Sequence, residues 1–257
     1  MQDLNVTLVQ ANQFWEDKNR NLAHFNGLLS RINVPTDLIV LPEMFHTSFT
    51  MNAIELAEPM DGEGVKWLSE KAAEYDSAIT ASLIIHENDR YYNRMVFVTP
   101  EGVQGYYDKR KLFGLAGEDE HFDAGKKNTV VNYKGWKLLL QVCYDLRFPE
   151  NCRNKIFEGT AEYDAIIYVA NWPQKRSSHW IKLLPARAIE NQAYVVAVNR
   201  MGKDGKNFSY SGDSCVINPT GEFEHHLSEK EGLINAVLQK TELEDLRKDL
   251  PFLKDRD

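Results

Sequence analysis

The stretch Leu138-Leu-Leu-Gln-Val-Cys143-Tyr-Asp-Leu-Arg147-Phe-Pro-Glu150 combines an apolar run, a thiol and a polar turn. The apolar run is typical of a buried strand, and Pro149-Glu150 is suited to beginning a helix. Nucleophiles are often found where a strand passes into a helix, because the turn exposes the side chain and the following backbone N–H groups can hold an oxyanion. Cys143 is therefore a candidate nucleophile, with an inert buried cysteine as the ordinary alternative.

The composition is that of a globular, enzyme-sized domain. The chain has 257 residues, 43% of them hydrophobic and 11% aromatic, which is enough for a sizeable core. The formal charge is −8 and the longest basic cluster is Lys109-Arg110-Lys111, so neither a nucleic acid nor a membrane is expected as a partner. No apolar run approaches the roughly 20 residues that span a bilayer. Three cysteines without metal-type spacing, and no signal-like N-terminus, favour a reducing cytoplasm.

Strand-like and helix-like segments alternate along the whole chain. Strands are predicted at residues 4–11, 37–42, 78–85, 91–99, 103–107, 129–133, 136–142, 164–170, 193–199, 214–218 and 232–238. Helices are predicted around residues 22–32, at 62–75, from Pro149, at 177–191 with a possible kink at Pro185, and from Thr241. Residues 117–125 are too irregular for a core element and are expected to form a surface loop. This interleaving predicts one α/β domain over residues 1–257.

Reactive side chains follow three of the predicted strands. Glu43 comes after Leu-Ile-Val-Leu-Pro42, Lys109 after Gly-Tyr-Tyr-Asp108, and Cys143 after Leu-Leu-Gln-Val142. Catalytic groups of open α/β sheets gather beyond the carboxyl ends of the strands, so these three are expected to meet. The chain has no HExxH motif and no phosphate-binding glycine motif, and no metal site is expected.

The surroundings of these groups resemble the Glu-Lys-Cys motifs of the nitrilase, or carbon–nitrogen hydrolase, superfamily. The motifs occur in order and cover nearly the whole chain: Pro42-Glu43, Tyr107-Asp-Lys-Arg-Lys-Leu-Phe113, Cys143-Tyr-Asp-Leu-Arg-Phe-Pro-Glu150, Ala170-Asn-Trp-Pro173, Ala186-Arg-Ala-Ile-Glu-Asn-Gln-Ala193 and Gly212-Asp-Ser214. The resemblance implies a four-layer αββα sandwich. It also implies a homodimer formed through the helices after the cysteine and the C-terminal segment.

The resemblance implies a role for each group. Cys143 would attack an amide carbon as Glu43 takes its proton, while Lys109 and the backbone N–H of Tyr144 hold the oxyanion. Glu43 would then protonate the leaving ammonia and activate the water that hydrolyses the thioester. Glu118 is the candidate for a second glutamate that orients Lys109 or binds the leaving group, unless it belongs to a solvated acidic loop. No metal or organic cofactor is expected.

The Lys-Arg-Lys-Leu-Phe segment and the loop at 117–125 are most similar to bacterial ω-amidases. This similarity implies a small-molecule substrate, the ω-amide of a 2-oxo acid such as 2-oxoglutaramate or 2-oxosuccinamate, which yields a dicarboxylate and ammonia. An N-carbamoyl amidohydrolase or another small aliphatic amidase is the alternative. A non-catalytic interaction module is the alternative from a different class, but such a protein would have no need for a buried charged cluster, whose desolvation is costly.

Several further residues are candidates for contact with the substrate. The cations available for its carboxylate are Arg147, Lys175 and Arg176. Arg147 is nevertheless expected to form an ion pair with a local carboxylate such as Glu150. Phe113 and Trp172 either line the pocket or belong to the core. Cys152 and Cys215 are expected to be structural.

Overall fold

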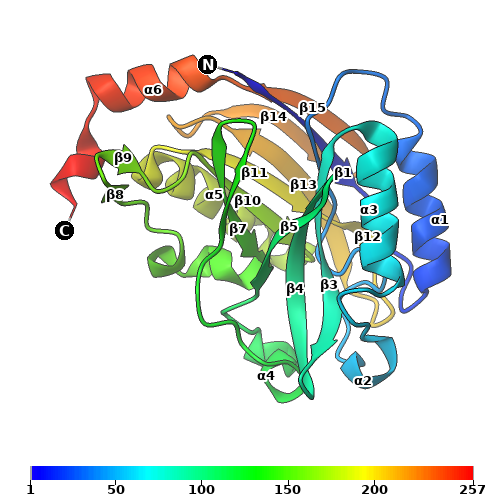
Figure 1. The fold of residues 1–257 in the computed structure, drawn as a ribbon. Helices are drawn as coiled ribbons and strands as arrows, with labels where there is room; N and C mark the ends of the chain where they lie inside the picture. Colours follow the sequence, from blue (N-terminus) through cyan, green and yellow to red (C-terminus); the bar gives the residue numbers. More distant parts are fainter. Residues whose placement is uncertain (1, 257) are drawn as a thin grey trace.

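Two stacked β-sheets form the centre of the computed structural model, which describes residues 2–256 (Figure 1). The first sheet has the strand order β15-β1-β2-β3-β4-β5. Strands β1, β2 and β3 run parallel, and β15, β4 and β5 are joined through antiparallel pairs. The strand bounds are β1 Leu4–Gln10, β2 Leu38–Val40, β3 Ala78–Glu87, β4 Arg90–Thr99, β5 Gly102–Asp108 and β15 Gly232–Leu238.

The second sheet has the order β12-β13-β11-β10-β7-β6, and β14 also pairs with β13. Its strands β7, β10 and β11 run parallel. The bounds are β6 Val130–Tyr133, β7 Trp136–Val142, β10 Ala165–Ala170, β11 Tyr194–Asn199, β12 Met201–Lys203, β13 Ser209–Ile217 and β14 Phe223–Ser228. A separate hairpin pairs β8 Ile156–Phe157 with β9 Thr160–Ala161.

Helices cover the outer faces of both sheets. Figure 1 shows α1 and α3 side by side against the first sheet and α6 beside the N-terminus. The α-helices are α1 Lys18–Leu29, α2 Ala53–Leu56, α3 Glu63–Tyr75, α4 Glu118–His121, α5 Ser177–Asn191 and α6 Lys240–Asp249. The 3-10 helices are η1 Gly114–Ala116, η2 Cys143–Arg147, η3 Pro149–Asn151, η4 Gln174–Arg176 and η5 Phe252–Asp255. Within the described residues, no helix is long and apolar enough to cross a membrane.

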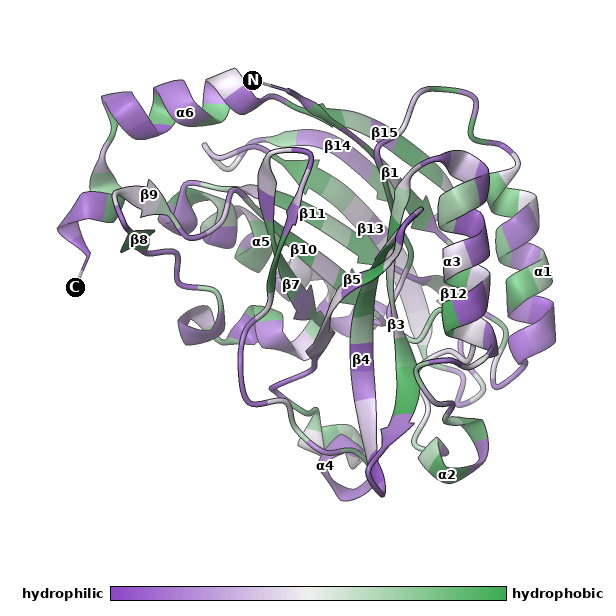
Figure 2. Ribbon diagram, viewed as in Figure 1, coloured by the Kyte–Doolittle hydropathy of each residue, from purple (hydrophilic) through white to green (hydrophobic). Residues whose placement is uncertain are grey.

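Three apolar cores explain the layering. In α3, Val65, Leu68 and Ala72 recur at helical spacing and pack with α1 against the first sheet. A central core fills the space between the sheets with residues such as Leu8 and Leu140. A third core lies between the second sheet and α5. In Figure 2 the strands are largely hydrophobic, whereas α1 and α3 carry both hydrophobic and hydrophilic residues along their length, as helices do when one face is buried. The predicted four-layer αββα sandwich is thereby confirmed.

The parallel strands bring their carboxyl ends to the same region of the sandwich. Glu43 follows β2, and Lys109 directly follows β5, which runs in the direction of β2. Cys143 directly follows β7 and Asn171 directly follows β10, and both of these strands belong to the second sheet. The site is therefore assembled from both sheets.

The segment after Cys143 differs from the sequence-based expectation. The structure has two short 3-10 helices there, η2 and η3, instead of a longer helix beginning at Pro149. Buried hydrogen bonds to Asp145 hold these turns, so local propensity for a regular helix is overridden by tertiary contacts.

Two other expectations need correction. The loop at residues 117–125 contains the short helix α4, and Glu118 at its start is completely buried. The strands β8, β9, β12 and β14 were not predicted. β14 is mostly exposed and lies at the edge of its sheet, so it lacks the alternation of apolar and polar residues that identifies a half-buried strand. By contrast, α5 spans the predicted residues 177–191.

Candidate active site

Cys143 stands in a left-handed backbone conformation with φ of 45° at the junction of β7 and η2. The Cβ atom of any residue other than glycine makes this region unfavourable, at a cost of about 1–3 kcal/mol, and such strain persists only where surrounding contacts impose it. The turn leaves Cys143 partly exposed, whereas Val142 before it is buried. The predicted strand-to-turn placement of the thiol is therefore found in the structure.

Asp145 supplies the contacts that hold this turn. Its carboxylate accepts hydrogen bonds from the Val142 N–H at 3.0 Å and the Lys111 N–H at 3.0 Å. It also accepts from the Tyr107 hydroxyl at 2.8 Å and from Asn151 Nδ2 at 3.2 Å. Burial raises the pKa of Asp145 to about 6, although these donors act in the opposite direction. The carboxylate thus links the segment that carries Lys109 to the turn that carries Cys143.

A buried cluster of charges lies next to the thiol. Lys109 Nζ donates to Glu43 Oε1 at 2.9 Å and to both carboxylate oxygens of Glu118 at 2.8 Å. The three side chains are at most 1% exposed. Glu118 also accepts from the Phe113 N–H at 2.6 Å. The structure therefore brings Glu43 together with Lys109 and Glu118, which lie more than 60 residues further along the chain.

Two asparagines complete the cluster, and the sequence analysis did not single them out. Asn93 Nδ2 donates to Glu43 Oε1 at 2.8 Å and to Glu118 Oε1 at 3.2 Å. The Asn171 N–H donates to Glu43 Oε2 at 2.8 Å, and its Nδ2 donates to the Glu43 carbonyl. A polar residue inside the predicted strand at 91–99 was the available signal for Asn93. For Asn171, the signal was its position directly after a buried strand.

The charges change the protonation of their neighbours. Burial alone would lower the pKa of Lys109, but the carboxylates of Glu118 and Glu43 outweigh it and raise this pKa, so the ammonium persists. Burial and the charge of Glu43 raise the pKa of the Cys143 thiol well above its ordinary value, although Lys109 acts in the opposite direction. Burial also raises the pKa of Glu118. At neutral pH, the resting thiol is protonated and needs a base before it can attack.

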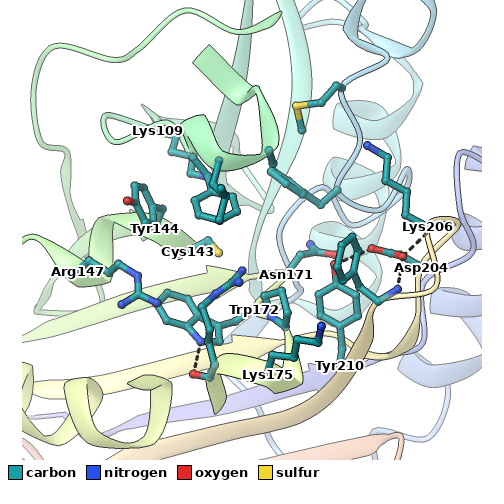
Figure 3. Close-up of a pocket in the computed structure, with 18 residues that line it drawn as sticks. Lys109, Cys143, Tyr144, Arg147, Asn171, Trp172, Lys175, Asp204, Lys206 and Tyr210 are labelled. Atoms are coloured by element: carbon teal, nitrogen blue, oxygen red, sulfur yellow. Dashed lines mark hydrogen bonds between the residues drawn. The ribbon is translucent and has the colours of Figure 1, made fainter. Parts of the chain in front are cut away.

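Cys143 opens into a cavity of about 390 Å³ (Figure 3). Figure 3 shows its sulfur near the middle of the view, with Tyr144 and Arg147 on one side and Asn171 on the other. Further lining residues come from distant segments: Phe49, Met51, Lys109, Phe113, Leu115, Ala116, Pro173, Lys175, Arg176, Asp204, Lys206, Phe208 and Tyr210. Glu43 and Glu118 are fully buried and are not lining residues, but both accept hydrogen bonds from the lining residue Lys109. A small organic molecule fits a cavity of this size.

The three residues predicted to contact the substrate, Phe113, Arg147 and Trp172, all line the cavity. The expected ion pair between Arg147 and Glu150 is wrong: Glu150 pairs with Lys111 at 3.3 Å, because the 3-10 turn directs Arg147 toward the cavity.

Cys152 and Cys215 are free, buried and outside the cavity lining, as expected of structural residues. Among residues 2–256, no group of three or more His, Cys, Asp or Glu side chains is arranged to hold a metal ion.

The chain is similar to known proteins along nearly its whole length. A carbon-nitrogen hydrolase family model matches residues 5–248. The omega-amidase YafV of Yersinia enterocolitica is 43% identical to the chain over 258 residues, covering 100% of this chain and 98% of that protein. The 2-oxoglutaramate amidase of Bacillus subtilis is 30% identical over 253 residues, covering 97% and 96%.

A solved structure shares the whole fold. It is that of XC1258 from Xanthomonas campestris, a CN-hydrolase superfamily protein with an arsenic adduct in its active site. It matches with a TM-score of 0.98 and 40% identity, over 100% of this chain and 98% of that one. The chain therefore belongs to the carbon-nitrogen hydrolase family. It is a hydrolase that acts on non-peptide carbon–nitrogen bonds in linear amides.

Proposed function

We propose that this hydrolase cleaves the ω-amide of a small 2-oxo acid, such as 2-oxoglutaramate or 2-oxosuccinamate, to a dicarboxylate and ammonia. The observation that carries the chemistry is the buried Lys109, held between Glu43 and Glu118 beside the strained Cys143. The substrate class is supported by similarity over nearly the whole chain to an omega-amidase and to a 2-oxoglutaramate amidase.

The first half-reaction forms a thioester. Glu43 accepts the proton of the Cys143 thiol as sulfur attacks the amide carbon, because the resting thiol is protonated. The carbonyl oxygen becomes an oxyanion, which the Lys109 ammonium and the Tyr144 backbone N–H stabilise. The protonated Glu43 then donates its proton to the amide nitrogen, the carbon–nitrogen bond breaks, and ammonia leaves.

The second half-reaction regenerates the enzyme. Glu43 removes a proton from a water molecule that attacks the thioester, and the same donors hold the second oxyanion. The carbon–sulfur bond breaks, the product acid leaves, and Glu43 returns its proton to sulfur. Lys109 stabilises the oxyanion and does not act as the base, because its carboxylate neighbours keep its side chain protonated. Glu118 fixes the ammonium through two hydrogen bonds of 2.8 Å.

The test is ammonia release from 2-oxoglutaramate by the purified protein, compared with N-carbamoyl amino acids, neutral aliphatic amides and a nitrile. Cys143→Ala should abolish release, and Cys215→Ala should keep it, since Cys215 lies outside the cavity lining. Cleavage of an N-carbamoyl amino acid alone would replace the substrate assignment but keep the mechanism. Equal, slow iodoacetamide labelling of all three cysteines, with no hydrolysis, would instead favour a non-catalytic interaction module.

The remaining proposals concern the form of the enzyme in the cell. We infer a cytoplasmic homodimer in which residues 1–257 form one hydrolase domain. The absence of disulfides among the three cysteines agrees with a reducing compartment. Light scattering after size-exclusion chromatography would measure the mass, and a value of one chain would contradict the dimer.

A further inference from the structure

The charged side chains that line the cavity above Cys143 are mainly positive. The cations that line it are Lys109, Arg147, Lys175, Arg176 and Lys206, and Asp204 is the only carboxylate among the described lining residues. Lys109 is already neutralised by two glutamates. Asp204 accepts hydrogen bonds from the Lys206 N–H, the Phe208 N–H and the Tyr210 hydroxyl. The positive charge of the remaining cations is therefore available for a ligand.

Unlike Lys109, Arg147 and Arg176 have no carboxylate partner, and each lies next to an aromatic ring. The Arg147 guanidinium lies 4.6 Å from the centroid of the Trp172 ring, and Arg176 lies 5.2 Å from that of Phe113. A guanidinium that lies over a ring keeps its N–H edges free for hydrogen bonds. Lys175 and Lys206 are exposed, flexible and more strongly hydrated.

Neither arginine forms an ion pair within residues 2–256. Arg147 Nη2 contacts His179 Nδ1 at 3.1 Å, and its guanidinium is close enough to Arg176 for the second charge to lower its pKa, after burial. Two cations that line the same cavity without a carboxylate partner repel each other, and an anion bound between them removes that cost. The guanidinium fork matches the two oxygens of a carboxylate.

We propose that Arg147 and Arg176 form a carboxylate-binding subsite that holds the acid end of the substrate while its ω-amide carbon lies at Cys143. This subsite rests on the proposed function and gives it a selectivity rule. The enzyme prefers amides that carry a terminal carboxylate to neutral amides of equal length. Dicarboxylates bind the same subsite, so glutarate competes with the substrate.

The experiment compares 2-oxoglutaramate with pentanamide, a neutral amide with the same number of carbons. We expect Arg176→Gln to lower kcat/KM for 2-oxoglutaramate by about 10- to 100-fold, mainly through KM, because one charge-assisted hydrogen-bonded contact is lost. The value for pentanamide should stay within about twofold of the wild type. Arg176→Lys, which keeps the charge but not the fork, should fall in between. Lys182→Gln removes an exposed charge on α5 outside the cavity lining and should match the wild type.

A second measurement does not depend on turnover of a poor substrate. Glutarate should inhibit the wild type competitively, and its inhibition constant should rise by about 10-fold or more in Arg147→Gln and in Arg176→Gln. Circular dichroism checks that both variants fold. If the wild type hydrolyses 2-oxoglutaramate and both variants keep its KM and the glutarate inhibition, the subsite alone is overturned. If the wild type releases no ammonia from 2-oxoglutaramate, the proposed function and the subsite fall together.

Discussion

Glu43 is the residue on which the proposed reaction depends twice, as base and as acid. Its carboxylate accepts from Lys109, Asn93 and the Asn171 N–H, so its orientation is fixed before any substrate arrives. Glu43→Gln keeps the shape of the side chain but removes the proton acceptor. We expect kcat for amide hydrolysis to fall by about 100- to 10,000-fold.

The same substitution should act in the opposite direction on the resting thiol. Because the charge of Glu43 raises the pKa of Cys143, Glu43→Gln should lower this pKa and increase the thiolate fraction at neutral pH. Thiolate absorbance during a pH titration measures this. Glu150→Gln, at an exposed position, is the control for both measurements. A variant with a normal kcat would exclude Glu43 as the base.

The buried carboxyl group of Asp145 should make the free energy of unfolding depend on pH. Its pKa of about 6 in the folded protein lies above the ordinary 3.8, so the folded state binds the extra proton between these values. The stabilisation from this group is therefore fully present below pH 3.8 and is lost as the pH rises through about 6, by at most about 3 kcal/mol. Relative to Asp145→Asn, the free energy of unfolding of the wild type should rise as the pH falls from 7 to 4. Urea denaturation at several pH values measures this difference, and parallel profiles would contradict it.

At the scale of elements, the segment from Lys109 to Gly125 determines where the lysine points. The Gly125 N–H donates to the Lys109 carbonyl at 2.9 Å, which closes the segment. A Cβ at Gly125 would lie 2.0 Å from the backbone oxygen of Asp108. Gly125→Ala must therefore displace the backbone next to Lys109. We expect it to destabilise the protein by about 1–3 kcal/mol and to lower kcat.

The control for this prediction is a glycine with free space around it. Gly27 lies inside α1, and nothing lies within 4 Å of a Cβ added there. Gly27→Ala should stabilise the protein by about 0.5–1 kcal/mol because glycine is a poor helix former. Thermal denaturation and ammonia release compare the two variants. Equal behaviour of both would show that the Gly125 contact does not position the lysine.

At the scale of the whole molecule, the core between the two sheets keeps the two halves of the site together. Glu43 and Lys109 come from one sheet, and Cys143 comes from the other. Leu140 is fully buried between the sheets, three residues before the nucleophile. Leu140→Ala should lower the free energy of unfolding by about 2–5 kcal/mol. Ile54→Ala, at a position 76% exposed, should change it little, and equal losses in urea denaturation would contradict this account.

The long elements could be predicted because their signals are local. Hydrophobic periodicity predicted α3 and α5, and apolar runs predicted β7, β10 and β11. The short elements could not be predicted in this way. The 3-10 turns η2 and η3 depend on a carboxylate buried by contacts from other segments, and β14 exists because it pairs with β13 at an edge of the sheet.

Local sequence patterns were enough to predict the alternation of strands and helices and the positions of Glu43, Lys109 and Cys143 after three strands. These properties follow from nearest neighbours and from periodicity. The folded structure was needed to show that Glu118 is buried against Lys109, that Asn93 and Asn171 hold Glu43, and that Arg147 faces the cavity rather than Glu150. The contacts of Glu43 join segments distant in the chain, and the energies of all these contacts depend on burial, which the sequence pattern does not specify.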